Sequence, residues 1–215
     1  MREYDPYRPP QAPLLDQQLP AAFAGGDWSR SQLRVLGALA LGYLFGLFVL
    51  LVLSLWQVLH PQFAPLAFTH LLSLLLVLLW GYLLLRLRAL LAARFALHGL
   101  DWPVALQILL GLLATGFAAL HDSQAAGLAG WWELGYFALF VALGFSLLWF
   151  ALRLRRIRQP YPALRLFVWL VLLAGAGSAS GVLLVPALLL GLAASAALAW
   201  VFFTAAGELG AEPAA

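Results

Sequence analysis

Long apolar runs alternate along the chain with short segments that hold its arginines. The run Leu66–Leu85 contains no charge, eleven of its twenty residues are leucine, and Arg86 and Arg88 follow it closely. Twenty helical residues at about 1.5 Å each span roughly 30 Å, the thickness of the hydrocarbon core of a bilayer. This stretch is therefore predicted to be a transmembrane helix.

The same pattern recurs, and it predicts an all-α polytopic membrane protein with a bundle of six transmembrane helices. The expected spans are about 33–59, 66–85, 103–120, 131–152, 163–179 and 182–206. They form a transmembrane domain over 31–207. A proline-rich, disordered cytoplasmic leader (1–30) precedes this domain, and a short cytoplasmic tail (208–215) follows it. The fifth span is short, and the pattern leaves open whether it crosses fully or is re-entrant.

The positions of the arginines predict the orientation. All twelve basic residues are arginines, and they precede span one or lie between spans two and three or spans four and five. The other connections contain none. The positive-inside rule then places both termini in the cytoplasm. Trp56, Trp131 and Trp132 fall at the opposite boundary, where interfacial aromatic residues are expected.

Composition excludes several classes of protein. The chain is 64% hydrophobic and 10% charged, whereas an ordinary globular domain is about 25% charged. This leaves no room for a sizeable soluble domain. The basic residues form no continuous face, so nucleic acid is not an expected partner. The absence of cysteine excludes disulfides and thiolate metal sites.

Small residues recur every four positions in two spans, which predicts faces that another helix backbone can approach closely. These residues are Ala38, Gly42 and Gly46 in the first span and Ala187, Gly191, Ser195 and Ala199 in the sixth. Span two is nearly all leucine and is expected to face lipid. We therefore expect Gly191→Leu to destabilise the fold or strip a partner, and Leu76→Ala to do much less.

Three histidines are the weak candidates for a metal or haem site. His60, His70 and His121 are expected at the outer level of the membrane, with Asp122 and Glu133 nearby. Imidazole and carboxylate groups are ordinary metal ligands, and histidines can ligate haem. Their spacing matches no known metal motif, so we expect neither a metal nor another cofactor.

The interiors of the spans carry almost no ionisable group. Gln107 is the only polar group inside the third span, and no carboxylate pair falls within a span. A membrane protein that couples transport to protons or sodium normally has a buried charge. The pattern therefore argues against ion coupling, although not against transport of an apolar or lipid-like solute.

One short motif resembles an enzyme family. The run Ser-Ala-Ser-Gly at 178–181 resembles the Gly-x-Ser-Gly nucleophile turn of rhomboid intramembrane proteases, and Phe-Thr-His at 68–70 resembles their second span. The resemblance implies a histidine after the serine, on a later helix. No histidine follows His121, so Ser180 has no downstream base. We expect no catalytic residue and no enzymatic activity.

The leader carries a second resemblance. The segment Asp-Pro-Tyr-Arg-Pro-Pro-Gln-Ala at 5–12 resembles the Asn-Pro-Tyr-x-x-Pro-x-Ala opening of many uncharacterised bacterial inner-membrane proteins. Asp5 stands where asparagine is usual. The resemblance implies a location in the bacterial inner membrane and no mechanism.

Three functional hypotheses remain. The favoured one is a non-enzymatic accessory, scaffold or assembly subunit, because no catalytic group is found. The second is a small transporter or channel for an uncharged or lipid-like solute. The third is a membrane redox or metal protein that uses the outer histidines. The expected partners are the lipid bilayer and either other membrane-protein subunits or further copies of this chain.

Overall fold

The computed structural model describes residues 23, 28–60, 66–123, 129–157 and 159–211, and no strand occurs among them. Each of the six helices is long and apolar enough to cross a membrane. The prediction of an all-α protein with six potential spans is therefore confirmed, and the shortest helix, at 19 residues, is long enough to cross. The helices are α2 (Arg30–Leu59), α3 (Leu66–Phe95), α4 (Asp101–Ser123), α5 (Ala129–Leu154), α6 (Pro162–Ser180) and α7 (Leu184–Ala211).

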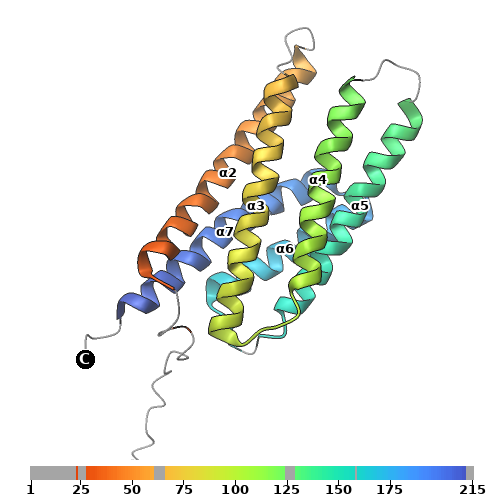
Figure 1. Cartoon of the computed structure of the whole chain (residues 1–215). Coiled ribbons are helices and arrows are strands. Elements are labelled where there is room, and N and C mark those ends of the chain that lie inside the picture. The colour runs from red at the N-terminus through yellow and green to blue at the C-terminus, as the bar shows by residue number, and fades with distance from the viewer. Residues whose placement is uncertain (1–22, 24–27, 61–65, 124–128, 158, 212–215) are drawn as a thin grey trace, which may run out of the picture.

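The six helices form a closed ring (Figure 1). Each helix packs against the next one along the chain, and α7 packs against α2, which closes the ring. The most extensive contacts join α7 to α6 and to α2, and α6 to α5. Residues from all six helices can therefore face one central space.

Local signals define the helix ends. Ser29 caps α2: its hydroxyl oxygen accepts a hydrogen bond from the Gln32 amide at 3.1 Å, and the Gln32 side chain accepts one from the Ser29 amide at 3.2 Å. Helix α3 ends at Phe95, and Ala96 follows it with a φ of 51°, in the left-handed region that often ends a helix.

The arginine-bearing helix ends gather at one end of the bundle, which we call the arginine end; the opposite end is the far end. Arg88 at the end of α3 pairs with Asp101 in the first turn of α4. The first hydrogen bond of α4 runs from the Val104 amide to the Leu100 carbonyl at 3.0 Å. The other contacts here are Arg86 over Trp28, Arg94 with Glu208, and Arg155 over Trp169.

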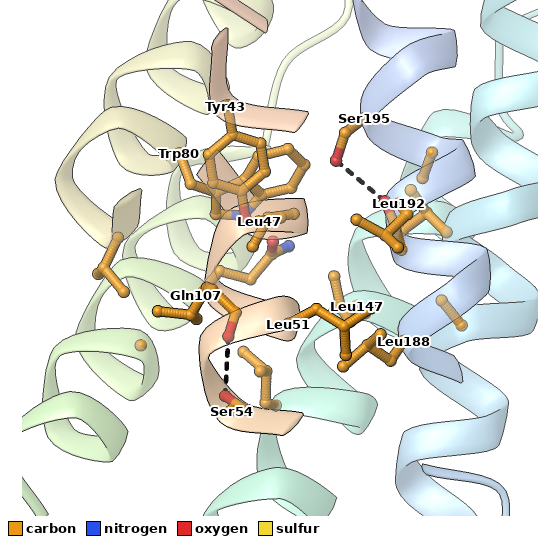
Figure 2. Close-up of a pocket in the computed structure, with 18 residues that line it drawn as sticks. Tyr43, Leu47, Leu51, Ser54, Trp80, Gln107, Leu147, Leu188, Leu192 and Ser195 are labelled. Carbon is orange, nitrogen blue, oxygen red and sulfur yellow. Dashed lines mark hydrogen bonds between the residues drawn. The ribbon is translucent and has the colours of Figure 1, made fainter. Parts of the chain in front are cut away.

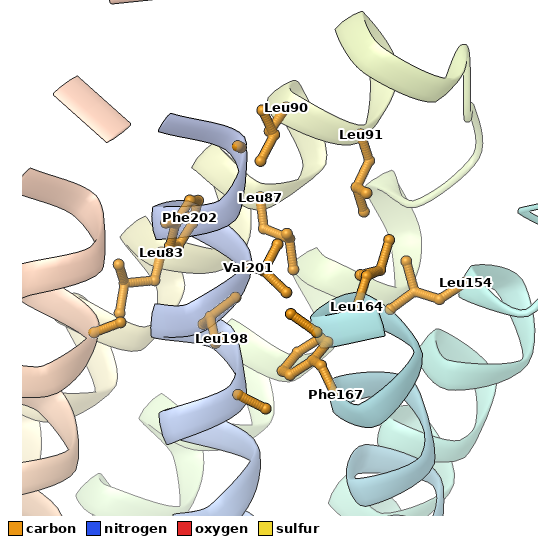
Figure 3. Close-up of a cluster of buried hydrophobic side chains, with 14 of the residues drawn as sticks. Leu83, Leu87, Leu90, Leu91, Leu154, Leu164, Phe167, Leu198, Val201 and Phe202 are labelled. Carbon is orange, nitrogen blue, oxygen red and sulfur yellow. The ribbon is translucent and has the colours of Figure 1, made fainter. Parts of the chain in front are cut away.

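A buried cluster of large side chains fills the half of the bundle nearest the arginine end (Figure 3). Because lipid tails are as apolar as these side chains, close van der Waals contact rather than escape from water holds them together. The cluster includes Leu83, Leu87, Leu90, Leu154, Leu164, Phe167, Leu198 and Phe202.

Helix α3 departs in part from one sequence-based prediction. Span two was expected to face lipid, and Leu71, Leu75 and Leu78 are more than half exposed. Leu83, Leu84 and Leu87, however, belong to the core, and Leu76 is only 4% exposed. A nearly all-leucine helix has no polar position that marks one face, so its pattern cannot predict its rotation. Phe23, within the predicted disordered leader, is also buried in the core; residues 1–22 and 24–27 lie outside the described residues.

Candidate binding cavity within the helix ring

A cavity of about 390 Å³ lies within the helix ring (Figure 2). This volume falls in the range of about 300–1,000 Å³ that is usual for small-molecule sites. Every helix contributes to the wall: examples are Leu47 from α2, Val77 from α3, Gln107 from α4, Leu147 from α5, Ala174 from α6 and Gly191 from α7. The cavity is therefore a property of the whole ring.

The cavity lies beyond the core cluster, toward the far end. Helix α7 lines it with residues 188–195, whereas the core uses residues 194–206 of the same helix. Small residues on the wall, such as Gly111, Ala174 and Gly191, leave the space open. A Cβ atom built on Gly191 would meet no atom within 4 Å.

Two stacked aromatic rings form part of the wall. Tyr43 of α2 and Trp80 of α3 have ring centroids 5.1 Å apart and planes inclined by 22°. Both side chains line the cavity. They present a flat, polarizable surface against which an apolar ligand could pack.

Gln107 is the polar centre of the cavity. Its side chain is 2% exposed, and the structure gives neither Nε2 nor Oε1 a hydrogen-bond partner. Figure 2 shows the amide reaching into the space between α2 and α7. Leaving a buried amide unpaired costs about 1–3 kcal/mol. A bound molecule that supplied partners would recover this free energy. The sequence identified Gln107 as polar but gave no reason to assign it a role.

The two serines on the wall make local hydrogen bonds. The Ser54 hydroxyl donates to the Leu50 carbonyl, and the Ser195 hydroxyl donates to the Gly191 carbonyl, both at 2.9 Å. Their protons are therefore engaged within their own helices. Among the described residues that line the cavity, none is Asp, Glu, Arg, Lys or His. The site is suited to an uncharged, largely apolar molecule.

The residues that the structure describes do not form the candidate metal or haem site at the three histidines. His60 ends α2 with its ring 4.5 Å from that of Trp56, and His70 lies near the start of α3. No group of three potential metal ligands occurs in the described part of the chain. The His121 side chain lies outside that part, so the presence or absence of a metal or haem at the three histidines stays a prediction.

Ser180, the serine that resembles a rhomboid nucleophile, closes the turn between α6 and α7. Its hydroxyl donates to the Gly177 carbonyl at 2.7 Å and accepts from the Leu183 amide at 3.3 Å. Gly181 follows with a φ of 70°, a conformation that glycine adopts without steric cost. These contacts give Ser180 a structural role in the turn.

Two of the three small residues on α2 that were predicted to pack against another helix do not do so. Ala38 and Gly42 are exposed, and a Cβ on Gly42 would meet nothing within 4 Å. Gly46 does lie at a contact, because a Cβ there would fall 2.5 Å from Cδ2 of Leu76. Gly37 was missed: a Cβ on it would lie 2.7 Å from the ring of Phe203 in α7.

The four small residues that were predicted to pack on α7 also lie in different surroundings. Ala187 packs against α6, since a Cβ on Gly177 would lie 3.0 Å from that of Ala187. Ser195 and Ala199 are buried. The prediction for Gly191 is wrong, because this residue lines the cavity instead of a helix crossing. Residues spaced four apart are rotated by about 40° at each step around a helix, so a long series of them cannot all face the same neighbour.

A close crossing of α5 and α6 was not predicted. A Cβ on Gly144 of α5 would lie 2.8 Å from Cα of Ala179 and from the Gly175 carbonyl oxygen of α6. A Cβ on Gly175 would in turn lie 2.9 Å from the Leu148 amide nitrogen. Backbone meets backbone here, so neither side can yield to a larger side chain.

A hydrogen-bonded ionic cluster joins three helices at the arginine end. Glu208 of α7 accepts hydrogen bonds from Nε of Arg94 in α3 at 3.1 Å and from the Tyr161 hydroxyl, just before α6, at 2.6 Å. Burial, followed by the bond to Glu208, raises the pKa of Tyr161 above its usual value. The phenol therefore stays protonated at neutral pH and remains a donor.

No family model, curated protein or solved structure matches the chain. The resemblances of the leader and of the serine turn therefore stay predictions.

Proposed function

We propose that this chain is a small transporter or carrier of the bacterial inner membrane that binds an uncharged, largely apolar solute within its helix ring. The observation that carries the proposal is the cavity of about 390 Å³ to which all six helices contribute. A largely apolar cavity of this size can accept apolar guests.

The wall chemistry supports an uncharged solute. An ion transferred into a low-dielectric space needs a charged or coordinating partner, and the described lining residues offer no charged group. The same feature supports transport without proton or sodium coupling. The hypothesis of an accessory or scaffold subunit stays a prediction, because it depends on no particular residue of the structure.

The orientation is part of the proposal. The arginines support a cytoplasmic arginine end, which would place both termini in the cytoplasm and the cavity toward the outer leaflet. The chain has no cysteine, so single cysteines give a clean test in intact cells. His60→Cys at the far end should react with an impermeant maleimide, and Gln159→Cys should not. The reverse pattern would overturn the orientation.

Photolabelling tests the cavity itself. The full chain, in phosphatidylcholine vesicles, would be irradiated with a long-chain alkyl diazirine, and the adducts would be located by mass spectrometry. We expect adducts on cavity residues such as Leu47 and Leu147, in addition to labelling of lipid-facing residues.

Two matched variants separate the cavity from the lipid surface. Gly191→Leu places an isobutyl group in the cavity, whereas Gly42→Leu places the same group on an exposed helix face. Cavity adducts should disappear in Gly191→Leu and persist in Gly42→Leu. Adducts on lipid-facing residues alone in the wild-type protein would overturn the proposed function.

A further inference from the structure

We propose that Gln107 selects the ligand, and that the ligand is an uncharged amphiphile whose polar group both donates and accepts a hydrogen bond, as a hydroxyl does. This inference builds on the proposed function and names the class of molecule bound. It follows from one buried, unpaired amide set in a wall that is otherwise mostly apolar and carries no charged group.

The argument begins with the hydrogen-bonding capacity of the amide. Nε2 offers two donors and Oε1 accepts, yet both atoms are buried without a partner, and the side chain lines the cavity (Figure 2). In a wall made mostly of hydrocarbon, an unpaired amide is unfavourable, so a guest that supplies a hydrogen-bond partner is favoured over one that does not. A hydroxyl satisfies both atoms, a ketone satisfies only the donor, and an alkane satisfies neither.

A second glutamine shows what a helix-borne amide looks like when it is structural. Gln57 of α2 donates from Nε2 to the Thr69 hydroxyl of α3 at 2.8 Å and thereby joins two helices. Gln107 makes no such bond. The two residues therefore provide a matched pair for substitution.

The test uses competition against the alkyl diazirine in the same vesicles, with decanol, decanone, decane and decylammonium compared at equal mole fractions in the membrane. In the wild-type protein, decanol should prevent labelling of the cavity at about tenfold lower mole fraction than decane, a ratio that corresponds to one net hydrogen bond. Decanone should fall between them. Decylammonium should not compete, because the described wall offers no carboxylate.

Two substitutions test whether the preference for decanol over decane depends on Gln107. Gln107→Leu should make decanol and decane equally effective while the cavity is still labelled, and Gln57→Leu should keep the tenfold preference. Equal competition by decanol and decane in the wild-type protein would overturn this inference and leave the proposed function standing. Loss of the preference in Gln57→Leu would also overturn it. Absence of cavity labelling would instead contradict the proposed function.

Discussion

The two halves of the bundle use the same helices in opposite ways. Toward the arginine end, Phe167 of α6 and Phe202 of α7 are fully buried in a filled core. Toward the far end, Ala174 and Gly191 of the same two helices line a cavity. Helices α6 and α7 thus place large aromatic side chains in the packed half and small residues on the wall of the hollow half. From this difference we expect stability to reside chiefly in the first half and the proposed binding in the second.

The largest loss of stability is expected at the crossing of α5 and α6. Gly144→Leu forces a side chain against the backbone of Ala179, so the helices must separate, at a cost above about 3 kcal/mol. Folded yield and thermal unfolding in detergent would measure the effect. Gly116→Leu in α4, where a Cβ would meet nothing within 4 Å, is the matched control. Equal behaviour of the two variants would show that the crossing is not close.

The next largest effect is expected in the core. Phe167→Ala removes a fully buried ring and should lower the free energy of unfolding by about 2–4 kcal/mol, somewhat less than in a water-soluble core because lipid is also apolar. Phe145→Ala, at a position that is 61% exposed, should cost much less. Similar losses in the two variants would remove the distinction between core and lipid-facing surface.

A smaller effect is expected where α3 passes the hollow half. Leu76→Ala should destabilise by about 1–2 kcal/mol because Leu76 packs on Gly46, and partial collapse toward the cavity limits the loss. The adjacent Leu75→Ala, at a 57% exposed position, should have little effect. A neutral Leu76→Ala would restore the sequence-based view that this part of α3 faces lipid.

The ionic cluster provides a modest and nearly pH-independent contribution. Tyr161→Phe removes the bond to Glu208 and should cost about 1 kcal/mol. Because the pKa of Tyr161 is raised in the folded state, its contribution is full below the ordinary tyrosine pKa of about 10 and is lost only as pH rises above it. The difference between Tyr161→Phe and wild type should therefore stay constant from neutral pH to mildly alkaline pH. A difference that vanished already at neutral pH would contradict this account.

The spans and the gathering of the arginines could be predicted from the sequence because hydrophobic length and charge are properties of single segments. The cavity could not, because it depends on how six helices rotate toward one another. The glycines illustrate this limit. Gly42, Gly144 and Gly191 look alike along the chain, yet one faces outward, one meets a backbone and one faces empty space. Only their neighbours on other helices distinguish them.

The most direct test of the hollow half is the stability of Gly191→Leu beside that of Gly42→Leu. Both substitutions gain about 1 kcal/mol of helix propensity, so their difference reports the surroundings alone. If the hollow half contains the cavity, the new leucine side chain occupies empty space. Gly191→Leu should then unfold at a temperature equal to or above that of Gly42→Leu. If Gly191→Leu unfolds well below Gly42→Leu, as Gly144→Leu is expected to do, then Gly191 lies at a helix crossing and the cavity does not exist.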